Sequence, residues 1–200
     1  MSTTPRHQVL SVNIGRARKL RIDGPRSVQS AIAKQPTDQP VSVHSLGLQG
    51  DEQADLSVHG GLAKAVYAYP SEHAGFWQTV RAQAGVAGWG DAVAPGLFGE
   101  NLTLAGLLEA DAWIGDQLRF PGCVLAVSEP RLPCFKFDAA MGFAQASQLM
   151  VDSGYCGFYL AVLVPGSIAA GQPFEIEPGP REVSIAELFR ARRPKRSRRG

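Results

Sequence analysis

Cysteine is scarce in this chain of 200 residues, and its spacing argues against the common cysteine-based sites. The three cysteines, Cys123, Cys134 and Cys156, form no C-x-x-C pair, and their number is odd. This argues against a disulfide framework and a zinc knuckle, and it favours a reducing compartment. The four histidines show no i, i+4 or H-E-x-x-H spacing, so a helical zinc site is not predicted either.

Long hydrophobic runs are also missing. No apolar run approaches the ~18 residues that a membrane-spanning helix needs. Residues 1–9 contain no apolar segment of the signal-peptide kind, so we expect a cytoplasmic protein with no membrane contact. There is no G-x-x-x-x-G-K-[ST], and no G-x-G-x-x-G follows a strand and opens a helix, so nucleotide folds of those kinds are not indicated.

What the chain has in abundance is turn residues. Gly 22 and Pro 14, with 44% hydrophobic and 19% charged residues, indicate a globular, β-rich chain. We predict an α+β fold, with many short strands and intercalated helices forming a partly closed β-barrel with peripheral helices. Strands are expected at 9–14, 16–21 (strand or turn), 30–34, 41–44, 63–69, 101–104, 116–120, 124–128, 157–164 and 173–177. Turns are expected at 35–40, and helices at 71–84 (capped by Ser71), 138–152 and 183–189.

Positive charge is concentrated at the C-terminus. Seven of the last eleven residues are Arg or Lys, and without them residues 1–189 have a formal net charge of −5. We therefore predict one domain over residues 1–189 and a disordered basic tail over residues 190–200. Such a tail is expected to be solvated, with weak contact to nucleic acid as the alternative.

Cys134 lies between two cations in a segment stiffened by prolines. Arg131 precedes it and Lys136 follows it, and an extended backbone would put Lys136 on the same side as the thiol. Cationic neighbours favour the thiolate, which is both a nucleophile and a soft metal ligand. The alternative is a buried structural cysteine beside surface charges.

A polar, glycine-rich segment forms a second candidate site. Its backbone amides are suited to hold an anion, and nearby side chains add donors for a phosphate or an oxo group. The alternative is a hairpin loop whose glycines adopt positive φ and whose acids cap backbone amides. The candidate residues are Gly50, Asp51, His59, Gly60, Gly61 and Lys64.

Glu100 and Asn101 form a third candidate site. A carboxylate and an amide at the start of a strand are suited to read the edge of a base-like ring, and the alternative is a simple turn. A hydrolase triad of Cys134, His59 and Asp51 is a further reading, although no local hydrolase signature accompanies the cysteine.

Taken in order, these segments resemble the MOSC family, the domain related to the C-terminal part of molybdenum cofactor sulfurases, and within it the YiiM-like branch. The similarity runs from about Val9 to Phe189. The matching segments are Gly47-Leu48-Gln49-Gly50-Asp51-Glu52-Gln53-Ala54-Asp55, Val58-His59-Gly60-Gly61, Tyr69-Pro70 with Glu72-His73, Phe98-Gly99-Glu100-Asn101-Leu102, Ile114-Gly115-Asp116 and Ser128-Glu129-Pro130-Arg131-Leu132-Pro133-Cys134-Phe135-Lys136.

The resemblance implies a MOSC β-barrel that binds a pyranopterin molybdenum cofactor in a basic cleft, with Cys134 as the molybdenum ligand. It implies reduction of N-hydroxylated bases such as hydroxylaminopurine, with electrons from a separate flavin reductase. A homodimer and a family-level association with pyridoxal phosphate belong to the same expectation. Arg131, Lys136, Lys64 and the glycine nest would offset the cofactor's phosphate, and His59, then Glu100, would supply protons.

Two further expectations follow from the resemblance. Other MOSC proteins are thought to carry sulfur, so a Cys134 persulfide in a sulfur carrier without redox activity is the alternative function. Members of the YiiM-like branch usually continue into a C-terminal helical domain. Here Phe189 is followed by the basic tail, which we expect to dock an acidic reductase instead.

Overall fold

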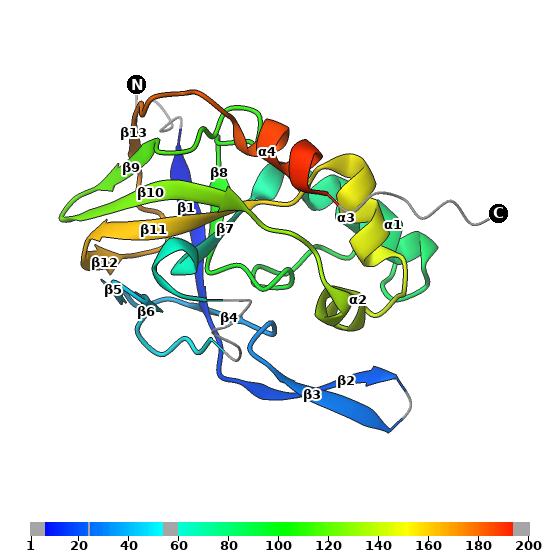
Figure 1. Ribbon diagram of the computed structural model, residues 1–200. Coiled ribbons are helices and arrows are strands. Elements are labelled where there is room, and N and C mark those ends of the chain that lie inside the picture. The colour runs from blue at the N-terminus through cyan, green and yellow to red at the C-terminus, as the bar shows by residue number, and fades with distance from the viewer. Residues whose placement is uncertain (1–6, 24, 54–59, 194–200) are drawn as a thin grey trace.

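The computed structural model describes residues 7–23, 25–53 and 60–193, and it confirms the predicted α+β barrel-like fold (Figure 1). One mixed sheet of eight strands curls into a half-barrel in the order β13-β9-β10-β11-β7-β8-β1-β4. Its strands are β1 (Gln8–Ile14), β4 (Gln35–Thr37), β7 (Val66–Pro70), β8 (Leu102–Ala105), β9 (Gln117–Phe120), β10 (Cys123–Pro130), β11 (Phe158–Val164) and β13 (Glu175–Glu177).

The core lies inside this curl. Strands β7 and β8 run parallel, whereas β10 pairs antiparallel with β11 and β9. Large side chains that are fully buried fill the space between the sheet and the helices, among them Trp77, Tyr69, Phe137 and Phe158. Aromatic contacts link them: the Trp77 ring meets the Phe137 ring edge-on, with centroids 5.7 Å apart. This packing fixes the ends of β7 and β10, where the candidate site lies.

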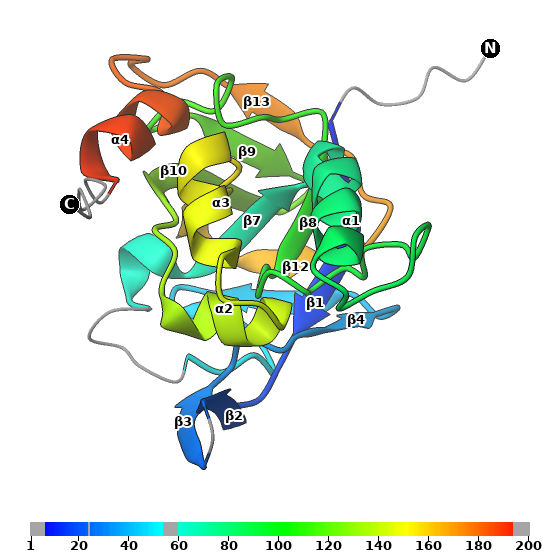
Figure 2. The same ribbon diagram turned by 90° about the vertical axis from the view of Figure 1, so that its right-hand side faces the viewer.

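Three helices cover one side of the sheet, and a fourth lies at its edge (Figure 2). They are α1 (Ala74–Gln83), α2 (Phe135–Met141), α3 (Ala146–Ser153) and α4 (Ile185–Arg192). Helix α4 begins with a capping box in which Ser184 accepts from the Glu187 amide and Glu187 accepts from the Ser184 amide. In the described part of the chain, no helix has the length and apolar character needed to cross a membrane.

Two helix predictions need correction. The single helix expected over residues 138–152 is wrong, because α2 ends at Gly142, which adopts φ 84° in the left-handed region, and α3 begins later. Ser71 does not cap α1. It starts the short 3-10 helix η2 (Ser71–His73), and no side chain caps that helix or α1.

Several strand predictions are displaced. The strand expected at 30–34 is instead β3 (Arg26–Ser30), and the expected turn at 35–40 contains β4. Pro36 is tolerated in β4 because this strand lies at the edge of the sheet. Residues 63–69 begin with the 3-10 helix η1 (Leu62–Lys64) before β7. The remaining strands, β5 (Val41–His44), β6 (Gly47–Leu48) and β12 (Gly166–Ile168), form a small separate sheet.

One basic element stands apart from the main sheet, and a second ends the described chain. Strand β2 (Arg18–Asp23) pairs only with β3, and this two-stranded ribbon projects from the body (Figures 1 and 2). Helix α4 continues through Arg192, so the first residues of the expected tail are helical, whereas residues 194–200 lie outside the described residues. The predicted division of the chain at residue 189 stays a prediction.

Candidate functional site

A pocket opens where the end of β3, the loop after β6, the start of β7 and the segment before α2 come together. It encloses about 680 Å³, including its open mouth. Four of its lining residues are cationic and one is a cysteine. The lining comprises Ser30, Ala31, Ile32, Lys34, Asp51, Glu52, Gln53, Lys64, Ala65, Tyr67, Phe98, Gly99, Asn101, Arg131, Cys134, Lys136 and Tyr159.

Cys134 lines the pocket from a backbone that is held in place. It is extended (φ −139°, ψ 168°) and immediately precedes α2. Its carbonyl accepts from the Phe137 amide at 2.8 Å and from the Ser147 hydroxyl at 3.2 Å. Cys134 is half-buried, whereas Cys123 and Cys156 are buried, so the cysteine singled out by the sequence is the one that reaches this pocket.

Lys136 also reaches the pocket, but not for the reason expected. An extended backbone was expected here, because it would point the Lys136 and Cys134 side chains to the same side. The chain is helical from Phe135 onward, so that assumption is wrong. Both side chains nonetheless line the pocket, because it wraps around the first turn of α2.

Arg131 forms the buried cationic wall of the pocket. Its guanidinium lies 4.6 Å from the centre of the Phe137 ring and 5.4 Å from that of Tyr67, and it donates to the Met150 sulfur at 3.3 Å. Among the described residues, no carboxylate lies within ion-pair distance of it. A buried cation held by aromatic faces is therefore ready to meet an anion that enters the pocket.

The charge of Arg131 is maintained despite burial. Burial lowers the pKa of its guanidinium, whereas the coulombic influence of Tyr67, Tyr159 and Cys134, which acts when those groups ionise, raises it. Near neutral pH the charge is kept because the pKa of an arginine lies far above that pH. Burial also raises the pKa of the Tyr67 and Tyr159 phenols. At neutral pH the pocket wall thus presents a cation beside two neutral phenols.

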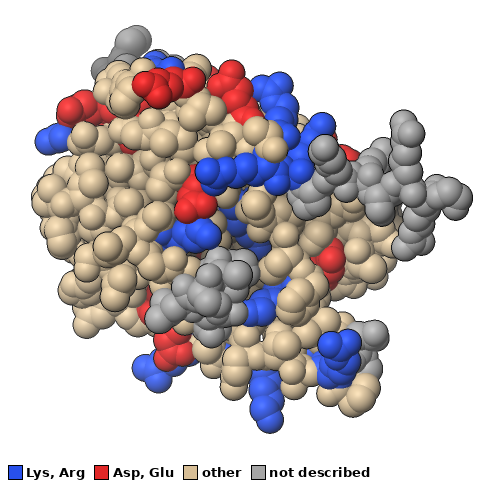
Figure 3. Space-filling model, in the orientation of Figure 1, with Lys and Arg blue, Asp and Glu red and all other residues tan. Residues whose placement is uncertain are grey.

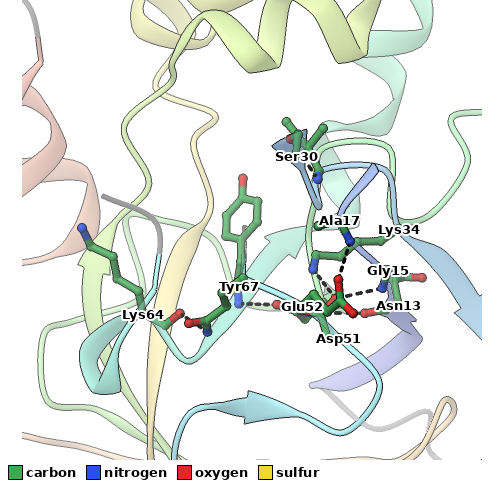
Figure 4. Close-up of polar contacts among 12 residues, drawn as sticks. Asn13, Gly15, Ala17, Ser30, Lys34, Asp51, Glu52, Lys64 and Tyr67 are labelled. Carbon is green, nitrogen blue, oxygen red and sulfur yellow. Dashed lines mark hydrogen bonds and ion pairs between the residues drawn. The ribbon is translucent and has the colours of Figure 1, made fainter. Parts of the chain in front are cut away.

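Asp51 and Lys34 form a buried ion pair on the opposite wall (Figure 4). The Asp51 carboxylate also accepts from the Gly15 amide at 2.8 Å and from the Asn101 side-chain amide at 2.9 Å. Burial lowers the pKa of the Lys34 ammonium, and Asp51 partly offsets this effect. Because Asp51 is bound by three donors, it holds the segments around it in place. The hydrolase triad stays a prediction, since His59 lies outside the described residues.

The predicted glycine nest does not line the pocket. The Gly61 amide donates to the Gln53 side chain at 3.2 Å, and the Asp51 amide donates to the Leu48 carbonyl at 3.1 Å. Neither Gly50 nor Gly60 is part of the pocket lining. His59 lies outside the described residues.

Glu100 lies beneath the pocket, and its side chain is not part of the lining. Its carboxylate accepts from the amides of Gly96 at 2.6 Å and Phe98 at 3.0 Å, and from the Thr103 hydroxyl at 3.0 Å. Burial raises the pKa of this carboxyl, while the hydrogen bonds oppose the shift. In this position Glu100 orders the loop before β8, and its adjacent residue Asn101 reaches the pocket.

Lys64 marks the edge of the pocket toward α4. Its ammonium lies 5.9 Å from the centre of the Tyr159 ring and 3.9 Å from the Glu129 carboxylate. Glu129 also lies 3.6 Å from the Arg192 guanidinium of α4. One carboxylate therefore connects the pocket edge to the basic end of the described chain.

The donor set limits what the pocket can hold. Among the described residues, no group of three or more His, Cys, Asp and Glu side chains is arranged to bind a metal ion. A single thiol among four cations suits an anionic group that brings most of its own metal ligands with it. A pyranopterin molybdenum cofactor has both properties, since it carries a phosphate and brings its own sulfur ligands to the metal.

Lys34, Tyr67 and Tyr159 are the lining residues with polar side chains near the cysteine and cations that the sequence did not indicate. Lys34 precedes a predicted turn and belongs to no motif, so nothing in the sequence connects it with Asp51. The tyrosines lie in apolar strands and looked like core residues. Only the pairing of β11 with β7, which places Tyr159 opposite Tyr67, brings them together at the pocket.

Comparison with known proteins gives consistent matches. A sequence model of the MOSC domain matches residues 55–175. The chain is 37% identical to the uncharacterised protein YflK of Bacillus subtilis, over 86% of this chain and 73% of YflK. It is also 37% identical to YiiM of Escherichia coli, over 82% of this chain and 70% of YiiM. A Gibberella moniliformis protein named Reductase is 33% identical over 94% of this chain but 33% of that protein.

Solved structures agree with these matches. The crystal structure of YiiM from Geobacillus stearothermophilus superimposes with a TM-score of 0.72 at 32% identity, over 92% of this chain and 82% of that one. YiiM from Escherichia coli superimposes with a TM-score of 0.64 at 26% identity, over 94% of this chain and 76% of that one.

Proposed function

The chain belongs to the MOSC domain family, in its YiiM-like branch, and from this premise we propose that it is a molybdenum-cofactor-dependent reductase of N-hydroxylated compounds. One observation carries the proposal: Cys134 and Arg131 line the same pocket, and Arg131 is buried without an ion-pair partner among the described residues. The Gibberella relative named Reductase is consistent with this chemistry.

Residues on both walls have roles in this proposal. Cys134 would supply the protein's ligand to molybdenum, and Arg131, Lys136 and Lys64 would bind the phosphate and other anionic parts of the cofactor. Asn101 would hold the loop that carries Asp51. When bound, the cofactor supplies the exchange of two electrons with the substrate.

The reaction also needs protons. Reduction of an N–OH group takes up two electrons and two protons, breaks the N–O bond and releases water. Among the lining residues, Lys34 has a pKa lowered by burial, so it gives up a proton more readily than an ordinary lysine. We propose Lys34 as a further proton donor beside His59, which lies outside the described residues, and in place of Glu100, which lies outside the lining.

Electrons would come from a second protein. The three cysteines are all free and none pairs with another, so the chain holds no dithiol that could store two electrons. This chain corresponds to one third of the Gibberella Reductase, which therefore contains a large additional region. In the present protein, we propose that a separate flavin reductase fills the donor role.

Expression in a host that makes the cofactor tests the proposal. Parent protein and Cys134→Ala are compared for bound molybdenum, oxidised-pterin fluorescence, and reduction of hydroxylaminopurine by reduced methyl viologen. We expect near-stoichiometric metal and turnover in the parent, and loss of both in the variant. Turnover by metal-free protein, or no metal and pterin in either protein, would contradict it.

The same pocket supports one alternative, a sulfur carrier. Cys134 is the half-buried cysteine, while the other two are buried, so a persulfide would form there. Cyanide-labile sulfur on Cys134 after incubation of metal-free protein with a cysteine desulfurase would favour this function. Absence of this sulfur would count against the sulfur-carrier function.

A further inference from the structure

The β2–β3 ribbon concentrates positive charge in a small part of the surface. Residues 16–30 contain five Arg or Lys and one Asp, whereas residues 31–189 contain seven Arg or Lys against seventeen Asp or Glu. The ribbon is thus a basic element attached to an acidic body. Exposed positive charge is thus concentrated on the ribbon and at the C-terminal end of α4, and both attract a partner of negative charge.

The ribbon exposes its charge to solvent. Arg18, Lys19 and Arg26 are exposed, and among the side chains that the structure describes no carboxylate lies within ion-pair distance of Arg18 or Lys19. The half-buried Leu20 and Val28 are paired across the two strands, and α2 packs against β2. The ribbon therefore packs against the body through part of its surface, while Arg18, Lys19 and Arg26 stay exposed.

The ribbon leads directly to the pocket. Its last residue, Ser30, lines the pocket together with Ala31 and Ile32. On the opposite side of the pocket, α4 exposes further arginines at its end. Figure 3 shows Lys and Arg atoms in the hollow at the centre of this face, with more of them toward α4 above and the ribbon below.

Apolar side chains are exposed beside Cys134 in the chain. Leu132 is 39% exposed and Phe135 is 53% exposed, and they flank Cys134 in sequence. An apolar centre with a charged rim is the usual anatomy of a protein–protein interface. A nucleic acid bound to the ribbon would extend over the acidic body, where like charges repel it. A compact acidic protein would contact only the ribbon and the pocket mouth.

We propose that the ribbon, with Leu132 and Phe135, is the docking surface for an acidic flavoprotein that delivers electrons to the pocket. This rests on the proposed reductase function. The flavin hydroquinone is oxidised to the quinone and releases two electrons. The substrate takes them up with two protons, its N–O bond breaks, and water leaves.

The test uses cofactor-loaded full-length protein with two electron sources. Reduced flavodoxin serves as the acidic donor protein, and reduced methyl viologen bypasses any docking surface. The ribbon variant is R18E/K19E/R26E, with single variants K19E and R119E as a matched pair. Both single changes reverse one exposed strand charge, but Arg119 lies in β9, outside the pocket lining, and pairs with Glu177 at 2.9 Å, so the R119E protein also carries Glu177→Gln to avoid a new carboxylate pair.

We expect the ribbon variant to lower kcat/KM for flavodoxin by ~10-fold or more at low salt, with the methyl viologen rate unchanged. K19E should lower it by a few-fold and R119E should leave it unchanged, and the difference should shrink as salt is added. Flavodoxin binding by the metal-free protein should fall in parallel, which gives a readout independent of turnover.

Each other outcome has a separate meaning. No turnover with methyl viologen in the parent defeats the proposed function, while ribbon-dependent flavodoxin binding would still support the docking surface. Equal flavodoxin kinetics in all variants, or equal losses in K19E and R119E, overturns the docking proposal alone. Ribbon-dependent binding of a labelled single-stranded oligonucleotide that displaces flavodoxin overturns it in favour of nucleic acid.

Discussion

The side-chain amide of Asn101 donates a hydrogen bond to the Asp51 carboxylate over 2.9 Å, and so joins the start of β8 to the loop after β6. The same amide donates to the Asn13 carbonyl at 3.2 Å, and its oxygen accepts from the Tyr67 amide at 3.1 Å. One buried side chain thus forms hydrogen bonds to polar groups on three segments that meet at the pocket.

Replacing this amide should destabilise the protein. Asn101→Leu keeps the volume but leaves the Tyr67 amide and the Asn13 carbonyl without their partner, and we expect a loss of about 3 kcal/mol or more. Asn101→Asp keeps the acceptor for Tyr67 but faces Asp51 with a second carboxylate, so its loss should shrink as the pH is lowered. Urea unfolding at pH 5 and pH 8 measures both. A loss below about 1 kcal/mol in Asn101→Leu would show that the amide is dispensable.

The Lys34–Asp51 pair should show strong coupling. Asp51→Asn leaves a buried ammonium without its counterion, and we expect it to cost about 3–5 kcal/mol of unfolding free energy. Lys34→Met removes that ammonium, so the double variant should recover ~1–3 kcal/mol relative to the sum of the single changes. A double-mutant cycle by chemical unfolding measures the coupling, and strictly additive losses would contradict it.

The sequence anticipated the fold better than the pocket walls. Short apolar segments bounded by turn residues predicted β1, β5 and β11, and the ordered motifs placed Cys134 and Arg131 in one site. These features follow from local pattern and resemblance. The end of α2 could have been predicted from Gly142, since glycine commonly ends helices in the left-handed conformation.

What the sequence did not show depends on contacts between distant segments. Lys34 meets Asp51 only because the chain after β3 passes the loop after β6. Glu100 read as a residue facing a cleft, yet local amides of Gly96 and Phe98 turn its carboxylate inward. Neither pairing has a periodic or spacing signal.

Gly157 should tolerate no side chain, in contrast to nearby Gly154. Both have positive φ, 62° and 77° respectively. A Cβ on Gly157 would clash with the Ala68 carbonyl and lie 2.9 Å from ring atoms of Tyr67 and Tyr69, whereas a Cβ on Gly154 would meet nothing within 4 Å. We expect Gly154→Ala to cost about 1 kcal/mol from backbone strain alone, and Gly157→Ala at least ~3 kcal/mol. Similar melting temperatures for the two variants would contradict the packing around β7 and β11.

The cysteines should differ sharply in reactivity. In the folded protein, iodoacetamide should label Cys134 first, because Cys123 and Cys156 are fully buried. Peptide mass mapping after brief labelling at pH 8 checks the order, with urea-unfolded protein as the control in which all three react. Faster labelling of Cys123 than of Cys134 would be incompatible with this structure.

The buried Cys123 should also make stability depend on alkaline pH. Burial raises the pKa of its thiol to about 11 from 9.0. The folded state therefore keeps a proton that the unfolded state loses, so the stabilising contribution is complete below about pH 9 and is lost as pH rises toward about 11. Between these pH values the free energy of unfolding should fall by about 2–3 kcal/mol. Cys123→Ala should show a flatter pH profile in urea unfolding, and an unchanged slope between pH 9 and 11 would rule the effect out.

Arg131 should separate stability from cofactor binding. The guanidinium is buried at 5% exposure over the Phe137 and Tyr67 rings. Because no carboxylate among the described residues neutralises it, Arg131→Met leaves no opposite charge unpaired, and we expect a change in unfolding free energy within about 1 kcal/mol. An anionic cofactor would lose its buried cation, so oxidised-pterin fluorescence per chain should fall by ~10-fold or more.

Arg131→Lys is the matched control for that variant. It keeps a positive charge but lacks the planar guanidinium that stacks on both rings, so pterin content should fall less than in Arg131→Met. If Arg131→Met retained pterin at the level of the parent, the cation would have no part in binding. If it instead unfolded with a loss above about 3 kcal/mol, Arg131 would serve the core, and the buried cation would need an explanation other than an anionic ligand.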